Sequence, residues 1–187
     1  AFQNLQSIQT MVSTMEKDSS TIGTGKIKFL FKQPSQVKIE VLQSTRSEQK
    51  GAKLGFQSGG NQVKARAGGV LGIVSLTLSS TDSKVISSRK YQVTQIDLAS
   101  TMKRITRPGQ QTKAIGKTQI GSDNVIIIEI IPQGHFDPKI TKERIGIDMN
   151  TFMLRSQEMY EGDMMVYAMK VEQITMNPPL AANAFEI

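Results

Sequence analysis

The stretch Gly25–Val41, GKIKFLFKQPSQVKIEV, decides the fold of this chain. On each side of Pro34, apolar residues occupy every second position, and most of the positions between them are lysines or other polar residues. A period of two is the pattern of a β-strand with one face toward a core and one toward water. We therefore predict two antiparallel strands joined at the proline, sharing one apolar face formed by Ile27, Phe29, Phe31, Val37, Ile39 and Val41.

The alternation continues toward the middle of the chain. Leu54 and Phe56 stand among polar neighbours, Gly59-Gly60-Asn61 is a turn signal, and Val63 opens a further strand. The apolar stretch Val70–Leu78 then adds Leu76 and Leu78 to the same expected face. The first half therefore predicts an antiparallel meander with short polar turns.

The second half returns to strand patterns, and its last two strands meet at a hairpin signal, Glu161-Gly162-Asp163. We expect eight or nine strands in total. Those of the second half span Val125–Ile131, Arg144–Asn150, Phe152–Glu161 and Asp163–Gln173.

Two segments have helical spacing instead. Apolar residues recur at steps of three and four from Phe2 to Met15, which predicts an amphipathic helix ending near Lys17. Thr94–Ile105 has a similar pattern, with Thr94 as the expected N-cap and Arg107-Pro108-Gly109 as the stop.

These elements predict an α+β fold in a single domain, residues 1–187. A sheet of this size with two helices is best closed by strong curvature. We expect an open antiparallel half-barrel whose concave face is covered by an N-terminal helix and a mid-chain helix.

Composition excludes several kinds of chemistry. The chain has no cysteine, which removes disulfides, cysteine–zinc sites and thiol catalysis. It has ten methionines and no tryptophan. Flexible, polarizable methionine suits an interior that binds apolar ligands, and it equally serves ordinary core filling.

Charge and hydropathy bear on partners and location. The net charge is +7, but the lysines are scattered along alternating strands, which indicates a solvated sheet face and no nucleic-acid site. An anionic membrane surface stays open as a partner. The longest apolar run, Val125–Ile131, is too short to span a membrane. The chain starts at Ala1, as it would after removal of a signal peptide, or after trimming of the chain.

A search for catalytic and metal-binding motifs favours a protein without catalytic residues, metal or cofactor. His135 is the single histidine, and we expect it in a solvated turn. Neither a G-x-S-x-G elbow nor a phosphate-binding glycine loop is present. Carboxylate pairs such as Asp123 with Glu129, or Asp137 with Glu143, leave a hydrolase as the least favoured alternative.

The apolar face remains as the candidate functional feature. A partly open barrel of this length either fills its interior with side chains or encloses a ligand, and the pattern alone is compatible with both. We predict an apolar cavity for the acyl chain of a lipid or lipoprotein, lined by Ile27, Phe29, Phe31, Val37, Ile39, Val41, Leu54, Phe56, Leu76 and Leu78.

The order of the elements and three motifs resemble the bacterial lipoprotein-localisation (LolA/LolB-like) superfamily. The motifs are Gly25–Glu40, Gly146–Glu161 (GIDMNTFMLRSQEMYE) and Lys170–Ile187 (KVEQITMNPPLAANAFEI). The central block Gly51–Ile105 looks closer to envelope members of that fold whose function is undefined.

The resemblance implies a half-barrel with a helical lid, acyl-chain binding without catalysis, a periplasmic or outer-membrane location and a place in lipoprotein sorting. Departures separate the chain from the carrier and the receptor. Gln33 stands where the carrier has a basic residue before the proline, and the loop Thr45–Lys50 lacks the receptor's exposed apolar residue. The alternative is a protein-interaction or sensor module of the same fold, with an envelope protein as partner and no lipid cargo.

Overall fold

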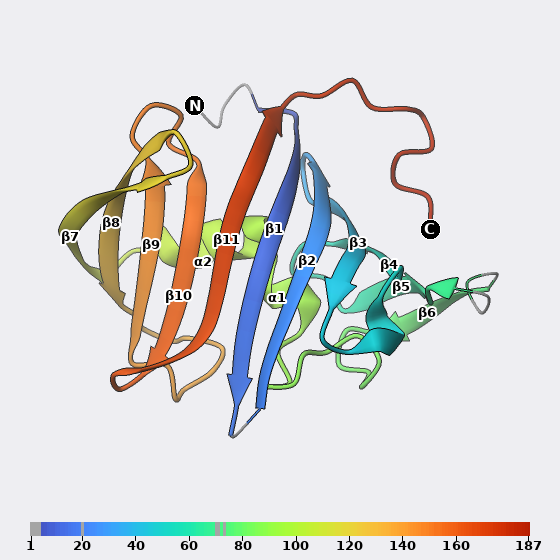
Figure 1. Ribbon diagram of the computed structural model, residues 1–187, viewed down its shortest axis with the longest axis horizontal. Helices are drawn as coiled ribbons and strands as arrows, with labels where there is room; N and C mark the ends of the chain where they lie inside the picture. Colours follow the sequence, from blue (N-terminus) through green and yellow to red (C-terminus); the bar gives the residue numbers. More distant parts are fainter. Residues whose placement is uncertain (1–4, 20, 70–71, 73) are drawn as a thin grey trace.

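The computed structural model describes residues 5–19, 21–69, 72 and 74–187. Its main feature is one antiparallel sheet of eleven strands, which is open because β6 and β7 form its two edges (Figure 1). The first six strands are β1 (Ser7–Asp18), β2 (Thr21–Lys32), β3 (Gln36–Ser44), β4 (Lys53–Gln57), β5 (Gln62–Arg66) and β6 (Ser75–Ser79). The other five are β7 (Gln111–Ile120), β8 (Asp123–Ile131), β9 (Lys142–Asp148), β10 (Leu154–Glu161) and β11 (Met164–Met176). A short 3-10 turn, η2 (Ser47–Gln49), lies between β3 and β4.

The strand order consists of two meanders joined side by side. Strands β6 to β1 follow one another in one half, and β11 to β7 in the other, so that β1 and β11 pair at the centre. Asn177 strengthens this junction, because its side-chain oxygen accepts hydrogen bonds from the backbone amides of Gln6 (2.8 Å) and Ser7 (3.1 Å). The meander expected from the alternating segments is confirmed for β2 to β5.

The N-terminal helix expected from the sequence is wrong, since residues 7–18 form β1, a central strand paired with β2 and β11. Ile8, Val12 and Met15 fit a helical spacing, but Ile8, Thr10, Val12 and Thr14 also fit a period of two. All four of the latter are β-branched residues, which favour strands, and pairing on both sides decides between the two periods. Phe2, the first residue of the expected helix, lies outside the described residues.

The described part of the chain contains two short helices, fewer helical residues than an α+β fold suggests. They are α1 (Val93–Ile96) and α2 (Leu98–Ile105). Together they match the predicted helix 94–105, interrupted at Asp97, where the backbone is extended. Asp97, and not Thr94, is the side-chain N-cap of α2, accepting hydrogen bonds from the amides of Ala99 and Ser100.

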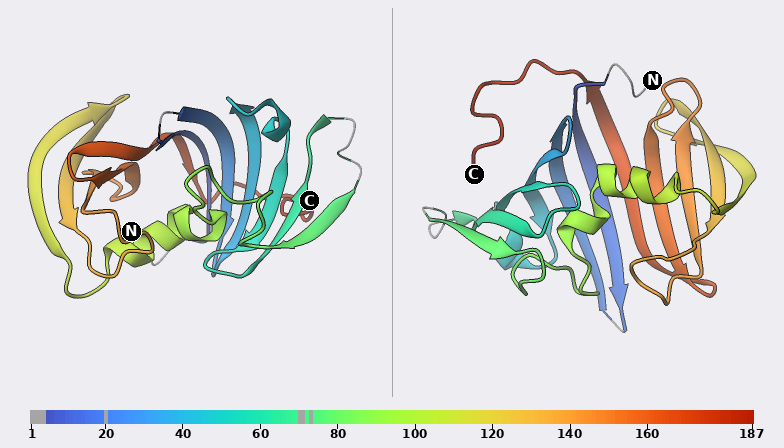
Figure 2. Two further views of the ribbon diagram at one scale, coloured as in Figure 1. Left: turned by 90° about the horizontal axis from the view of Figure 1, so that it is seen from below. Right: turned by 180° about the vertical axis from the view of Figure 1, so that it is seen from behind.

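The sheet is strongly curved, and α1 and α2 lie on its concave side (Figure 2). The core lies between them, where Leu98 and Ile105 of α2 are buried with the inward residues of the strands. The side chains of this core come from both halves of the sheet. Of the expected strand 70–78, the residues 75–79 form β6, whereas Val70 and Leu71 lie outside the described residues.

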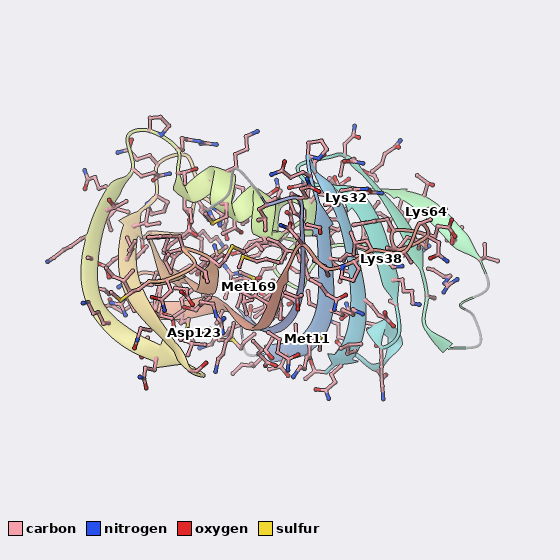
Figure 3. All side chains as sticks on the ribbon, turned by 90° about the horizontal axis from the view of Figure 1, so that it is seen from above. Met11, Lys32, Lys38, Lys64, Asp123 and Met169 are labelled. Carbon is pink, nitrogen blue, oxygen red and sulfur yellow. The ribbon has the colours of Figure 1, made fainter. Side chains whose placement is uncertain are left out.

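The convex side carries the lysines and the C-terminal segment. Lys32, Lys38 and Lys64 lie over one half of the sheet, on β2, β3 and β5 (Figure 3). The segment that follows β11 passes over β3, since the ammonium group of Lys38 donates to the carbonyl oxygens of Ala184 (2.9 Å) and Glu186 (2.7 Å). The predicted charged strand face is therefore partly covered by the chain's own backbone.

Candidate ligand-binding cavity

An apolar cavity of about 210 Å³ lies between the concave side of the sheet and helix α1. Strands β1 to β4 and β11 form its wall, and the loop before α1 together with α1 itself forms the opposite side. Its lining is mostly aliphatic and aromatic, which is the usual chemistry of a small-molecule site. The residues that face it from the strands include Val12, Ile27, Phe29, Ile39, Val41, Leu54, Tyr167, Met169 and Val171.

Five of the ten residues predicted for the cavity line it: Ile27, Phe29, Ile39, Val41 and Leu54. Val37 and Phe56 are buried in the core, and Phe31 faces a second cavity described below. Leu78 packs against the core without lining the cavity. Leu76 is 49% exposed, because it lies on the edge strand β6, where a neighbour is missing on one side. The part of all ten residues in ligand binding stays a prediction.

Three groups of lining residues were not predicted. Thr10, Val12 and Thr14 belong to β1, which the sequence pattern assigned to a helix. The others are Tyr167, Met169 and Val171 of β11, and Val93 and Ile96 of α1. The alternation of three β-branched residues in β1 was the signal that would have found the first group.

One end of the apolar cavity joins a polar hollow of about 170 Å³, which we call the mouth. Both spaces are bordered by Thr14, Ile27, Val41, Gln49, Ser87, Ile96 and Tyr167, so they adjoin. The mouth adds hydroxyl and amide groups from the ends of β2 and β3, and it adds Arg46 from the loop after β3. Lys84 borders the apolar cavity and precedes the shared residue Ser87 by three positions in the chain.

Glu16 fixes the loop that closes one side of the mouth. Its carboxylate accepts hydrogen bonds from the hydroxyls of Ser87 (2.5 Å) and Ser88 (2.7 Å) and from the amides of Ser88 and Arg89 (both 3.1 Å). Arg89 in turn donates to the backbone oxygen of Lys17 (2.9 Å) and pairs with Glu161. The loop is therefore tied to the ends of β1 and β10 by charge-assisted bonds.

A second cavity, of about 280 Å³, lies between helix α2 and the neighbouring ends of β1 and β2. Leu5, Ile8, Phe31 and Met102 are among its lining residues. Leu98, the first residue of α2, borders both this cavity and the first one. Its buried side chain therefore lies at the boundary of both cavities.

Asp97 holds Leu98 in this position. Besides capping α2, its carboxylate accepts a hydrogen bond from the hydroxyl of Ser58 at 2.9 Å. Burial raises the pKa of Asp97 above its ordinary value, while the bonds from Ser100 and Ser58 act in the opposite direction. The helix start is therefore fastened to the turn after β4 as well as to its own backbone.

The other end of α2 is fastened by a buried polar cluster. The guanidinium of Arg104 contacts both carboxylate oxygens of Glu143 on β9, at 3.2 and 3.1 Å, and stacks over Phe136 at 5.1 Å. The side-chain amide of Gln157 donates to the same carboxylate at 2.7 Å. This cluster joins α2 to strands β9 and β10.

His135 belongs to this cluster, and the expectation of a solvated histidine is wrong. Its side chain is only 2% exposed, with Nε2 3.4 Å from Oε1 of Glu143. The backbone amide and the carbonyl oxygen of Asp137 both lie 3.0 Å from Nδ1, which fixes the orientation of the ring. Burial lowers the pKa of His135, Glu143 opposes this effect, and Arg104 adds to it.

The carboxylates considered for catalysis are each engaged elsewhere. Asp123 pairs with Arg155, and Glu129 with Arg144. Asp137 accepts a hydrogen bond from the hydroxyl of Tyr91 at 2.6 Å. Burial alone would raise the pKa of Asp137, but the bonds from Tyr91, the Lys139 amide and Arg89 hold it below its ordinary value.

Two further properties concern the described residues alone. Within residues 5–19, 21–69, 72 and 74–187, histidine and carboxylate side chains do not gather into a group of three that would hold a metal ion. Across the same residues, neither short helix has the length and apolar character needed to cross a membrane.

Comparison with known proteins gives a likeness of structure without one of sequence. No protein-family model matches the chain, and no curated protein does. An uncharacterized conserved protein from Thermus thermophilus superposes with a TM-score of 0.59 and 9% identity, over 98% of this chain and 86% of that one. The Mycobacterium tuberculosis lipoprotein LppX gives a TM-score of 0.53 and 14% identity, over 96% and 90%.

A LolA superfamily protein from Nitrosomonas europaea matches with a TM-score of 0.44 and 10% identity, over 98% of this chain and 91% of that one. At these identities the likeness concerns the fold. The resemblance that the sequence motifs indicated is confirmed at that level: the chain has a LolA/LolB-like fold.

Proposed function

We propose that this protein binds one acyl chain of a lipid or lipoprotein in the cavity on the concave side of its sheet, without catalysing a reaction. The observation that carries the proposal is the cavity of about 210 Å³, bounded by aliphatic and aromatic side chains from five strands. An apolar cavity of ~150 Å³ is enough to bind benzene, so this one suits a single chain segment of about eight carbons.

Burial of the chain supplies the affinity. Each methylene transferred from water to such a lining contributes ~0.8 kcal/mol. In this proposal α1 and α2 cover the concave face, and the cavity lies between α1 and the sheet. Val93 and Ile96 of α1 face the bound chain from that side.

The proposal places the protein in the bacterial cell envelope, in the periplasm or at the outer membrane, with outer-membrane lipoprotein sorting as its process. The support is the shared fold, together with the fact that LppX, one of its structural relatives, is itself a lipoprotein. The acyl chain of a lipoprotein would then be the cargo.

Native mass spectrometry of the protein purified from its own envelope tests the proposal, followed by organic extraction of the bound material. We expect a stoichiometric lipid or acyl peptide. We expect Val41→Asp to lose it, because Val41 borders both the cavity and its mouth. Ile115→Asp is the matched control, since Ile115 is exposed on β7, away from the cavity.

A second candidate function, a protein-interaction module, is favoured by the edge strand β7. Nine of its ten residues are exposed, and its outer edge has no strand partner among the described residues. An extended peptide can add to such an edge through backbone hydrogen bonds. A protein mass without ligand, unchanged after incubation with lipids and lipopeptides, would reject acyl-chain binding in favour of this function.

A further inference from the structure

The cavity and its mouth differ in chemistry in a way that matches an amphiphile. The apolar cavity holds aliphatic and aromatic groups, whereas the mouth collects threonine and serine hydroxyls, glutamine amides and a guanidinium. The two spaces share Ile27, Val41 and Tyr167 at their junction. A ligand with one apolar chain would therefore end in the mouth with its polar group.

Several polar groups around the mouth are occupied by partners within the protein. The Thr45 hydroxyl accepts from the Thr24 amide at 3.1 Å, and the Gln49 side chain accepts from the Ser44 hydroxyl at 2.8 Å. These bonds shape the rim. They leave the head group of a ligand to be recognised by other side chains.

The carboxylates that border the two spaces are satisfied in the same way. Glu16 accepts four hydrogen bonds from residues 87–89. Asp97 accepts two from the start of α2 and one from Ser58. Neither carboxylate is therefore available to pair with a cationic head group without breaking bonds that hold the loop or the helix.

Two cationic side chains that border these spaces lack partners among the described residues. Arg46 lines the mouth and Lys84 lines the adjoining apolar cavity, and both are exposed. Within the described part of the chain, neither side chain has an ion-pair or hydrogen-bond partner, unlike Arg89 and Lys53 nearby. Their hydrogen bonds are formed by the backbone: the amides of Arg46 and Lys84 donate to Ser44 and Asp82, and the carbonyl oxygen of Arg46 accepts from the amide of Gln49.

We propose that the ligand is an anionic single-chain amphiphile, with its chain in the apolar cavity and its phosphate or carboxylate head group held at the mouth by Arg46 and Lys84. This inference rests on the proposed acyl-chain binding and adds the charge of the head group. A guanidinium suits it, because its fork of N–H donors matches the oxygens of phosphate and carboxylate.

Three amphiphiles with the same chain test the head group separately from the chain: octyl phosphate, octyltrimethylammonium and 1-O-octylglycerol. Binding to the delipidated protein is measured by calorimetry below micelle-forming concentrations. We expect octyl phosphate to bind most tightly and its affinity to fall as salt is raised. Arg46→Ala should lower the affinity for octyl phosphate about fivefold, which is the effect of one exposed ion pair. It should leave the affinity for 1-O-octylglycerol unchanged.

Charge reversal and a matched control complete the test. Arg46→Glu with Lys84→Glu should make octyltrimethylammonium the preferred ligand. Lys113→Ala removes an equal charge from β7, distant from the mouth, and should change nothing. Equal affinity of the native protein for all three amphiphiles, unaltered by Arg46→Ala, would overturn the inference that the head group is anionic. It would leave the proposed acyl-chain binding in place. Failure of all three to bind would overturn acyl-chain binding itself.

Discussion

Arg104 of helix α2 and Glu143 of strand β9 form a buried, two-pronged ion pair, with Nη2 3.1 Å from Oε2 and Nε 3.2 Å from Oε1. The pair joins the end of α2 to β9, while Leu98, at the other end of the same helix, borders the cavity. One helix of eight residues thus spans both halves. Its position over the cavity depends on an anchor outside the cavity.

Removal of one partner of this pair should destabilise the protein strongly. Glu143→Gln leaves the guanidinium of Arg104 buried without a counter-charge, and breaking a buried pair in this way costs about 3–5 kcal/mol. We expect the free energy of unfolding, measured in urea, to fall by about that amount.

The double variant Arg104→Met with Glu143→Leu is the control for this prediction. It removes both charges, and replacing a buried pair by apolar residues of similar volume is often neutral for stability. A double variant as unstable as Glu143→Gln would show that the packing of these side chains matters more than their charges.

His135 should make the stability depend on pH in a defined direction. Burial holds its folded-state pKa below the ordinary value of 6.5, so in that range the unfolded chain binds a proton that the folded protein does not. Stability therefore falls as the pH is lowered from about 6.5 toward the folded-state pKa. The slope is at most ~1.4 kcal/mol per pH unit for one proton.

Urea unfolding at a series of pH values between about 7.5 and about 5 measures this slope. His135→Gln keeps a polar side chain of similar size and removes the titrating group, so its curve should be flatter over the same range. Assignment is direct because the chain has a single histidine. Parallel curves for the two proteins would contradict the prediction.

The sequence predicted the half of the sheet in which apolar and charged residues alternate without ambiguity. Phe29 and Ile39 are buried, and both face the cavity as expected. Exposed lysines in the same strands fix the period at two. In β1 the charged residues are missing until Glu16, and Ile8, Val12 and Met15 satisfy a helical period too. Local pattern was insufficient there, and pairing with β11 decides the structure.

Other features depend on contacts between distant segments. Strand β7 was not predicted, since nearly all of its residues are exposed and its pattern lacks an apolar face. His135 was expected in solvent because a glycine- and proline-rich turn usually is exposed, but its ring packs against Phe136 and lies beside Glu143. Leu76 fits the apolar alternation and yet is exposed, because its strand lies at the edge of the sheet.

Lys38 should hold the C-terminal segment on the convex side of the sheet. Burial, with the nearby charge of Lys53, lowers the pKa of this lysine, consistent with its place beneath the segment. Gly55 leaves room for the same segment, since a Cβ there would be 2.7 Å from Cγ1 of Ile187. Lys38→Met removes both bonds to the carbonyl oxygens of Ala184 and Glu186.

We expect limited proteolysis to cut residues 178–187 several-fold faster in Lys38→Met than in the native protein, with little change in global stability. Lys28→Met is the matched control, because Lys28 is exposed on the adjacent strand. If the segment is cut at the native rate in Lys38→Met, the other contacts, such as the Ser75 hydroxyl with the carbonyl oxygen of Ile187, are sufficient.

Leu98 should set the length of chain that the cavity accepts. It borders both the cavity of about 210 Å³ and the second one of about 280 Å³, and we expect its side chain to separate them. Leu98→Ala would join the two spaces, at a cost in stability of about 2–5 kcal/mol for a buried leucine. In a series of alkyl phosphates, affinity for the native protein should rise with chain length and level off at about eight carbons.

For Leu98→Ala the affinity should continue to rise well beyond that length, because each added methylene then enters the second cavity and contributes ~0.8 kcal/mol. Met102→Ala, which enlarges only the second cavity, should keep the native limit. The same limit in Leu98→Ala would mean that the two compartments do not join, and that the chain ends against another part of the wall.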